Sequence, residues 1–237
     1  YGWGVEPTTH TGLQGTYVLN EMLSVSAGVA NTFGPSINER AFYDRAESYK
    51  TYMGSLTFTA PTNAGFLSGS SVTACVINGF NSTSPIVPTG ASTSKTTAGA
   101  DQTSYYIGAS LNTPVTGLKA GVCYDYVGVS HQGLVGDTSY YANVVGLYAT
   151  YQLTPKLSIN ERGEYGWANT ATPFMTSKIV EVTSTLQYDL WKNVLSRLEF
   201  RWDHSADGTS IYGGETSDDT PTKKNSYILL ASLAYKF

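Results

Sequence analysis

The sequence has 237 residues, of which 41% are apolar and 14% are charged, and its formal net charge is −4. A soluble domain usually has about a quarter of its residues charged, so this composition departs from that class. The longest apolar run, Tyr227 to Tyr235, is shorter than the roughly 18 residues that suggest a membrane helix. No basic cluster could follow a phosphate backbone. A helical membrane protein and a nucleic-acid-binding protein are therefore excluded.

Segments of about ten to thirteen residues recur along the chain, and in each of them apolar or aromatic residues alternate with small or polar ones. This period predicts β-strands, and no stretch has the period of a helix. All nine prolines lie outside the segments, as expected if each strand hydrogen-bonds to a neighbour on both sides. The pattern predicts about eleven strands in one domain, 1–237, at roughly 10–20, 22–33, 47–60, 69–80, 104–113, 118–130, 140–153, 156–168, 177–190, 194–204 and 225–237.

The connections between these segments alternate in length. Short connections fall at 20–21, 61–68, 114–117, 154–155 and 191–193. Long connections, rich in small polar residues, fall at 34–46, 81–103, 131–139, 169–176 and 205–224. Outer-membrane barrels keep short turns in the periplasm and long loops outside the cell, whereas a soluble sandwich has no reason for such asymmetry. The predicted fold class is an all-β, transmembrane antiparallel β-barrel with extracellular long loops.

In the last segment, alternate residues form two faces of different polarity. One face is wholly apolar or aromatic and ends at the C-terminal residue: Tyr227, Leu229, Ala231, Leu233, Tyr235 and Phe237. An ordinary amphipathic last strand would also show this pattern. Together with the connection lengths, it favours the terminal strand of a bacterial outer-membrane protein, with Phe237 at the periplasmic end.

Charged residues in the later segments occupy the opposite face. Arg197, Glu199, Arg201 and Asp203 alternate with apolar neighbours such as Leu198 and Phe200. An Arg or Lys near the bilayer midplane of a barrel costs about 2 to 4 kcal/mol, so such a ladder cannot face lipid. We expect the charged residues of this parity to line a polar pore: Lys119, Asp125, Arg162, Glu164, Glu181, Arg197, Glu199, Arg201 and Asp203.

Glu161 is an exception, because its parity places it on the lipid face. A local bulge or a contact in an oligomer would each accommodate it.

Aromatic residues of outward parity gather near the strand ends, as they do in the two aromatic girdles of a membrane barrel. On the short-turn side these are Tyr17, Phe58, Tyr151, Tyr188 and Tyr235, and toward the long loops they are Phe33, Phe80, Tyr126, Tyr165 and Trp202.

The only cysteines, Cys75 and Cys123, are too few for a disulfide scaffold or a thiolate zinc site. A predicted strand lies between theirs, which separates their Cα atoms by roughly 9 to 10 Å. Since a disulfide tolerates less than about 7 Å, we expect free thiols.

The sequences of the predicted strands resemble those of the OmpL-like β-barrel porin family of bacterial outer membranes. The resemblance runs from about residue 8 to Phe237, in the order HTGLQGTY, GVANTF, ESYKTYMGSLTFTAP, GFLSGSSVTACVINGFN, YYIGASLNTPVTGLKAGVCYDY and LSINERGEY. It implies a channel protein of a Gram-negative envelope. The family has no established catalytic residues to carry over, and from the resemblance we expect that the strands that members carry before the HTG segment are not represented in this chain.

An enzyme is not expected. The three histidines, His10, His131 and His204, form no Ser/His/acid grouping. The acidic loop with Asp207, Glu215, Asp218 and Asp219 has no calcium-loop spacing, and a solvated loop explains it. We expect no cofactor and no metal.

Three functions remain open. The first is a porin for passive diffusion of small hydrophilic solutes or ions. The second is a structural or conduit barrel around a partner protein such as an electron-transfer cytochrome, and the third is an outer-membrane hydrolase. The expected surroundings are outer-membrane lipid and lipopolysaccharide, and the sequence leaves open a homo-oligomer or a partner protein.

Closure gives a further expectation. With about eleven antiparallel strands, the first and last run in the same direction, whereas single-chain bacterial barrels normally have an even number. Unpaired strand edges in lipid cost several kcal/mol per backbone group. We therefore expect the chain to be part of a larger barrel of at least about twelve strands whose N-terminal strands are missing here.

Overall fold

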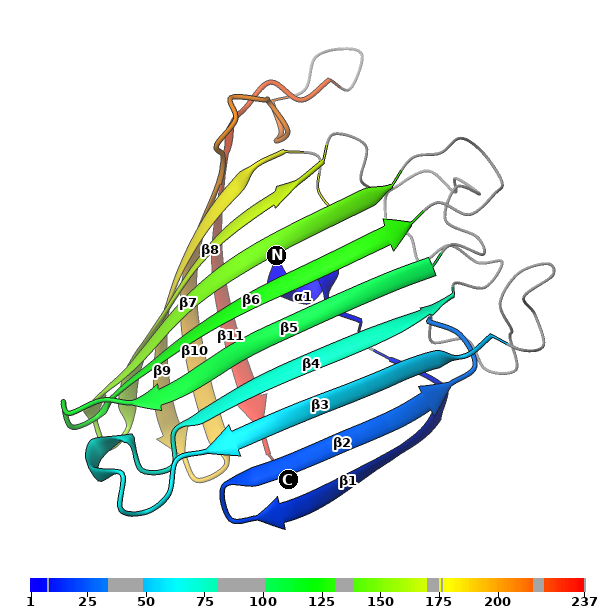
Figure 1. Ribbon diagram of the computed structural model, residues 1–237. Helices are drawn as coiled ribbons and strands as arrows, with labels where there is room; N and C mark the ends of the chain where they lie inside the picture. The colour runs from blue at the N-terminus through cyan, green and yellow to red at the C-terminus, as the bar shows by residue number, and fades with distance from the viewer. Residues whose placement is uncertain are drawn as a thin grey trace.

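The computed structural model describes residues 1–7, 9–33, 49–80, 101–130, 139–169, 175, 177–214 and 220–236. These residues form a single antiparallel sheet whose eleven strands lie side by side in chain order (Figure 1). The strands are β1 (Gly12–Asn20), β2 (Leu23–Ala30), β3 (Thr51–Thr59), β4 (Ser71–Phe80), β5 (Asp101–Asn112), β6 (Leu118–Ser130), β7 (Tyr140–Thr154), β8 (Leu157–Ala168), β9 (Ile179–Trp191), β10 (Val194–Ser205) and β11 (Asn225–Tyr235). The predicted all-β fold and strand number are confirmed.

Two short helices in the described part of the chain were not predicted. They are α1 (Gly2–Val5) and η2 (Gly65–Leu67), the second lying in the connection between β3 and β4. The sheet curls so that β9 to β11 lie behind the front strands, and α1 lies on the concave side (Figure 1). We call the face of the sheet that α1 packs against the inner face and the opposite one the outer face.

The strand bounds confirm that short and long connections alternate. Two residues join β1 to β2 and two join β9 to β10, whereas β2 and β3 are separated by residues 31–50. An asparagine at each of these two-residue turns suits the turn geometry. Asn20 accepts a hydrogen bond from the Met22 amide at 2.9 Å, and Asn193 adopts a φ of 68°, which asparagine tolerates better than most residues.

The large apolar side chains of the strands are mostly exposed on the outer face. Leu13 is 78% exposed on β1 and Leu229 is 73% exposed on β11, whereas Glu181 on the inner face of β9 is fully buried. This inverts the order found in soluble proteins, where Glu is almost never buried unless paired. The remaining exposed outer-face residues include Tyr17, Tyr52, Leu56, Val76, Tyr105, Ile107, Val122, Leu147, Tyr165, Leu186, Leu198, Phe200, Tyr227 and Leu233. So large an apolar surface needs a non-aqueous surrounding.

One member of the predicted aromatic girdles is misplaced. Phe33 is 2% exposed, and its ring packs edge-on against His10 with the centroids 5.6 Å apart. Phe33 lies beyond the end of β2, so the strand alternation does not apply to it. Burial in this contact lowers the pKa of His10.

Both cysteines are free, as predicted, because β5 separates their strands. Cys75 pairs across with Tyr106, and Cys123 pairs with Gly108 two residues further along β5.

The sheet is open between its first and last strands. Among the described residues β1 pairs with β2 alone and β11 with β10 alone, so each has one free edge. Because all pairings are antiparallel, β1 and β11 run in the same direction. The expectation that more strands belong to the barrel is not tested by this sheet.

Candidate functional site: the polar inner face

Two rows of charged side chains cross β8, β9 and β10 on the inner face. The cross-strand register aligns Glu164, Glu181 and Asp203 in one row, all buried. The next row lies two residues further along each strand. In it, Arg162 and Arg201 flank Thr183. Neighbouring strands lie about 4.8 Å apart, so three adjacent carboxylates repel one another unless cations lie close by. The arginine row supplies those cations.

Glu181 is the centre of this network. The Arg162 guanidinium donates to both carboxylate oxygens of Glu181, from Nε at 3.1 Å and from Nη2 at 3.1 Å. Arg201 Nε lies 3.9 Å from Glu181 Oε1, while Arg201 Nη2 donates to Asp203 Oδ1 at 2.8 Å. Thr183 also donates to Glu181. The planar guanidinium matches two carboxylate oxygens at once, which is why arginine rather than lysine fits here.

Toward the short turns the same face is more exposed, and hydrogen bonds rather than ion pairs hold its polar side chains. Thr185 donates to Glu199 at 2.9 Å, and Thr150 donates to Asn160 at 2.9 Å. Arg197 is exposed, and its Nε donates to Gln187 Oε1 at 2.9 Å. The charged ladder predicted on β10 therefore lies on one face, but only its half near the long connections is buried in ion pairs.

Of the two candidates on β6, Asp125 lies close to Glu164, and Lys119 lies away from the cluster. Asp125 is 2% exposed and accepts from the Cys123 thiol at 3.5 Å. A Cβ placed on Gly2 of α1 would lie 3.2 Å from Asp125 and 3.6 Å from Glu164, so α1 passes between these carboxylates. Lys119 is exposed at the other end of β6 and pairs across with Thr150.

The N-terminal segment was missed as part of the site. Val5 is buried against inner-face residues of β6 and β7, among them Val127 and Val144. The Tyr1 nitrogen donates to Glu164, and the Arg201 guanidinium lies 5.3 Å from the centroid of the Tyr1 ring. The apolar residues of inner parity at the end of β6 and the start of β7 were the available signal, since a uniformly polar lining would not contain them.

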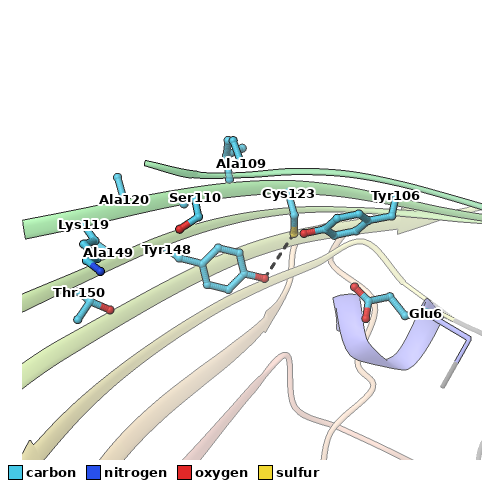
Figure 2. A pocket seen from close by; sticks show the side chains of 12 residues that line it. Glu6, Tyr106, Ala109, Ser110, Lys119, Ala120, Cys123, Tyr148, Ala149 and Thr150 are labelled. Atoms are coloured by element: carbon cyan, nitrogen blue, oxygen red, sulfur yellow. Dashed lines mark hydrogen bonds between the residues drawn. The ribbon is translucent and has the colours of Figure 1, made fainter. Parts of the chain in front are cut away.

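A pair of inner-face tyrosines was also missed. Tyr106 on β5 and Tyr148 on β7 extend from opposite directions toward Cys123, which lies between them on β6 (Figure 2). Cys123 pairs across with Gly108 on one side and Gly146 on the other. The Cys123 sulfur lies 3.5 Å from the Tyr148 hydroxyl, which donates to Glu164 at 3.4 Å. Tyr106, Cys123 and Tyr148, with Glu6 and Lys119, line a cavity of about 350 Å³.

Glu161 lies on the outer face, and the register around it is continuous, so no bulge explains it. Its Oε1 accepts a hydrogen bond from the Ser184 hydroxyl at 2.6 Å across the β8–β9 pair. This bond satisfies part of the hydrogen-bonding capacity of the Glu161 carboxylate.

The described histidines are held by neighbours. His204 Nδ1 lies 2.9 Å from Asn225 Oδ1, and its ring stacks on Trp202. His131 lies outside the described residues. Asp207 is held by local hydrogen bonds, and its acidic neighbours in 215–219 are also outside the described residues.

Within the described segments, no group of His, Cys, Asp and Glu side chains is placed to hold a metal ion. No helix in those segments is long and apolar enough to cross a membrane.

The sequence matches a family model described as "Putative beta-barrel porin-2, OmpL-like" over residues 1–237. No curated protein matches the sequence.

Solved outer-membrane proteins share the fold. OmpT of Vibrio cholerae superposes with a TM-score of 0.60 at 14% identity, over 95% of this chain and 64% of that one. The outer membrane channel DcaP of Acinetobacter baumannii gives a TM-score of 0.56 at 14% identity, over 94% of this chain and 61% of that one. The OmpT variant lacking loop L8 gives a TM-score of 0.56 at 15% identity, over 95% of this chain and 62% of that one. The chain thus spans less than two thirds of the length of these proteins, and identities this low show the fold alone.

Proposed function

Since the chain belongs to the OmpL-like β-barrel porin family and shares its fold with outer-membrane proteins, we propose that its sheet forms the wall of a water-filled channel. The channel passes small hydrophilic solutes or ions by diffusion across the bacterial outer membrane. The barrel has no catalytic role in this proposal.

The observation that carries the proposal is the separation of polarity between the two faces. Leu147 on the outer face of β7 is 61% exposed, while Glu164, Glu181 and Asp203 lie on the inner face. Lipid on the outside and water on the inside satisfy both faces, and the reverse arrangement would place several charges in hydrocarbon.

The inner face provides the pore lining. We propose that all nine charged candidates face the lumen: Lys119, Asp125, Arg162, Glu164, Glu181, Arg197, Glu199, Arg201 and Asp203. The ion-paired cluster around Glu181 fixes the shape of the wall near the long connections, and the exposed Arg197 and Lys119 contribute mobile charge near the short turns. Charged side chains along a pore wall set a field that acts on passing solutes.

The orientation follows from the connections. We propose that the short turns lie in the periplasm and the long connections outside the cell, as in other outer-membrane barrels. The strand β11 then runs toward the periplasm.

The free edges of β1 and β11 need partners in lipid, because unpaired backbone groups there cost several kcal/mol each. The two edge strands run in the same direction, so an odd number of further strands is needed to close an antiparallel barrel between them.

A conduit barrel is the second candidate, and α1 favours it. The inner face already packs against a peptide segment, with Val5 buried among Val127, Val144 and other apolar residues. A partner polypeptide could occupy the lumen by the same kind of contact.

Liposome swelling distinguishes the two. Purified full-length protein is reconstituted into liposomes, which are then diluted into isotonic arabinose. A diffusion channel gives swelling at a rate that rises with the amount of protein. Protein that is inserted, shown by protease protection, and yet gives no swelling would rule out the channel and leave the conduit.

A further inference from the structure

The cavity around Tyr106 and Tyr148 has features beyond those of a general pore lining. Each of these two tyrosines has a glycine two residues away on its own strand, Gly108 for Tyr106 and Gly146 for Tyr148. A Cβ on Gly146 would meet the Tyr148 hydroxyl at 2.6 Å, and a Cβ on Gly108 would overlap the Tyr106 hydroxyl. The glycines therefore let both rings lie along the sheet rather than stand away from it.

The two rings lean toward each other over one row of small residues. Gly108, Cys123 and Gly146 are aligned across β5, β6 and β7, and the tyrosines approach this row from opposite ends (Figure 2). Each ring approaches the glycine of its own strand through its hydroxyl and one edge. Tyr148 is nevertheless 38% exposed, so part of its side chain is open to the lumen.

Polar groups surround the rings of Tyr106 and Tyr148. Exposed Ser110 and Lys119 and the partly exposed Thr150 line the cavity on the short-turn side, and Glu6 lines it on the other. Hydroxyl, ammonium and carboxylate groups together offer both donors and acceptors. Lys119 is the one cation among the described residues that line the cavity, whereas Glu6 and the neighbouring Asp125 are acidic, which disfavours an anionic ligand.

A pyranose ring has the complementary form. Its C–H groups make an apolar face that stacks on an aromatic ring, and its hydroxyls project from the rim to hydrogen-bond with side chains. We propose that Tyr106 and Tyr148 form a binding subsite for a neutral saccharide in the channel wall. The subsite rests on the proposed channel function and names the class of solute that the channel favours.

The test is the block of ion current by maltotriose through single channels of the full-length protein in a planar bilayer. Polyethylene glycol of the same hydrodynamic size is the comparison, because it is neutral but has no ring to stack. Maltotriose should interrupt the current at concentrations at which polyethylene glycol does not. The double variant Tyr106→Ala with Tyr148→Ala should raise the half-blocking concentration by about tenfold or more, because it removes both aromatic stacking surfaces.

Two sets of variants control for folding. Tyr106→Phe with Tyr148→Phe keeps both rings and should stay within about threefold of the parent, because stacking needs the ring and not the hydroxyl. Tyr105→Ala with Tyr151→Ala removes tyrosines of the same strands from the outer face and should leave the block unchanged.

The outcomes separate the two proposals. A channel that conducts but is blocked equally by both probes, or whose block survives the double alanine variant, overturns the saccharide subsite and leaves the channel standing. If the protein does not conduct, maltotriose binding is read by saturation-transfer NMR on the detergent-solubilised protein. Binding that is lost in the double alanine variant then supports the subsite while the channel fails, and absence of binding overturns the subsite too.

Discussion

Arg162 binds both carboxylate oxygens of Glu181 from the neighbouring strand, with Nε and Nη2 each 3.1 Å from its acceptor. Glu181 is fully buried, so its charge depends on this partner and on Arg201. The relationship explains how a row of three carboxylates can persist on the inner wall of the sheet.

Replacing Arg162 should destabilise the barrel. Arg162→Met leaves Glu181 with the more distant Arg201 and should lower the free energy of unfolding by about 1 to 3 kcal/mol, as partial loss of a buried ion pair does. Urea unfolding in lipid vesicles measures this. Arg197→Met is the matched control, because Arg197 is exposed and bonds Gln187, and it should cost less than about 1 kcal/mol. Equal losses for the two variants would argue against a special role for the Glu181 cluster.

A lysine introduced on each face should report which side meets lipid. Leu147→Lys places a cation in the middle of β7 on the outer face and should destabilise the protein by about 2 to 4 kcal/mol in a bilayer. Ser110→Lys places one on the inner face, where the side chain is exposed, and should cost less than about 1 kcal/mol. The same unfolding measurement serves for both. A more harmful lysine at position 110 would reverse the assignment of the faces.

Releasing α1 from the wall should widen the pore. Val5→Asp buries a carboxylate among Val127, Val144 and Ile179, which disfavours the docked position of the helix. Single-channel conductance should rise. Gly4→Asp changes the same helix at an exposed position where a Cβ meets nothing within 4 Å, and it should leave the conductance unchanged. If both variants conduct like the parent, α1 does not restrict the pore.

The connection beyond β10 should be insensitive to pH until strongly acidic conditions. The Lys178 and Thr209 amides and the Ser177 hydroxyl donate to Asp207 and hold its pKa below the usual range. Because the folded pKa is depressed, the carboxylate stabilises this connection above the unfolded value near pH 4, and the stabilisation is lost as the pH falls below it. Hydrogen exchange at the Lys178 and Thr209 amides should stay slow from neutral pH down to about pH 4, after correction for the intrinsic rate. Asp207→Asn should speed it at neutral pH, and an unchanged rate would show that the carboxylate does not hold these amides.

The alternation of residues in the strands was sufficient to predict the sheet and the two faces. Arg197, Glu199, Arg201 and Asp203 fall on one face because the period of a strand is two, whatever its neighbours are. The free thiols of Cys75 and Cys123 followed from the order of the strands alone.

Features that depend on register or on isolated short segments were not predictable. The hydrogen bond between Ser184 and Glu161 needs the exact alignment of β8 and β9, so the sequence offered only a bulge or an oligomer contact. The approach of Tyr106 and Tyr148 over Cys123 depends on the register of the β5–β6 pair and on that of the β6–β7 pair. α1 has four residues, too few to show any periodicity, and Phe33 lies past its strand, where parity no longer applies.

The most direct test of a conducting lumen is the conductance of the purified full-length protein in a planar bilayer, with the reversal potential read in an asymmetric salt gradient. We predict discrete conductance steps, and a shift toward cation selectivity when the exposed Arg197 is replaced in Arg197→Glu, and a larger shift when Arg201→Glu is added. Folded, inserted protein that gives no steps, or steps whose reversal potential is the same in the parent and both variants, would contradict a pore lined by this face.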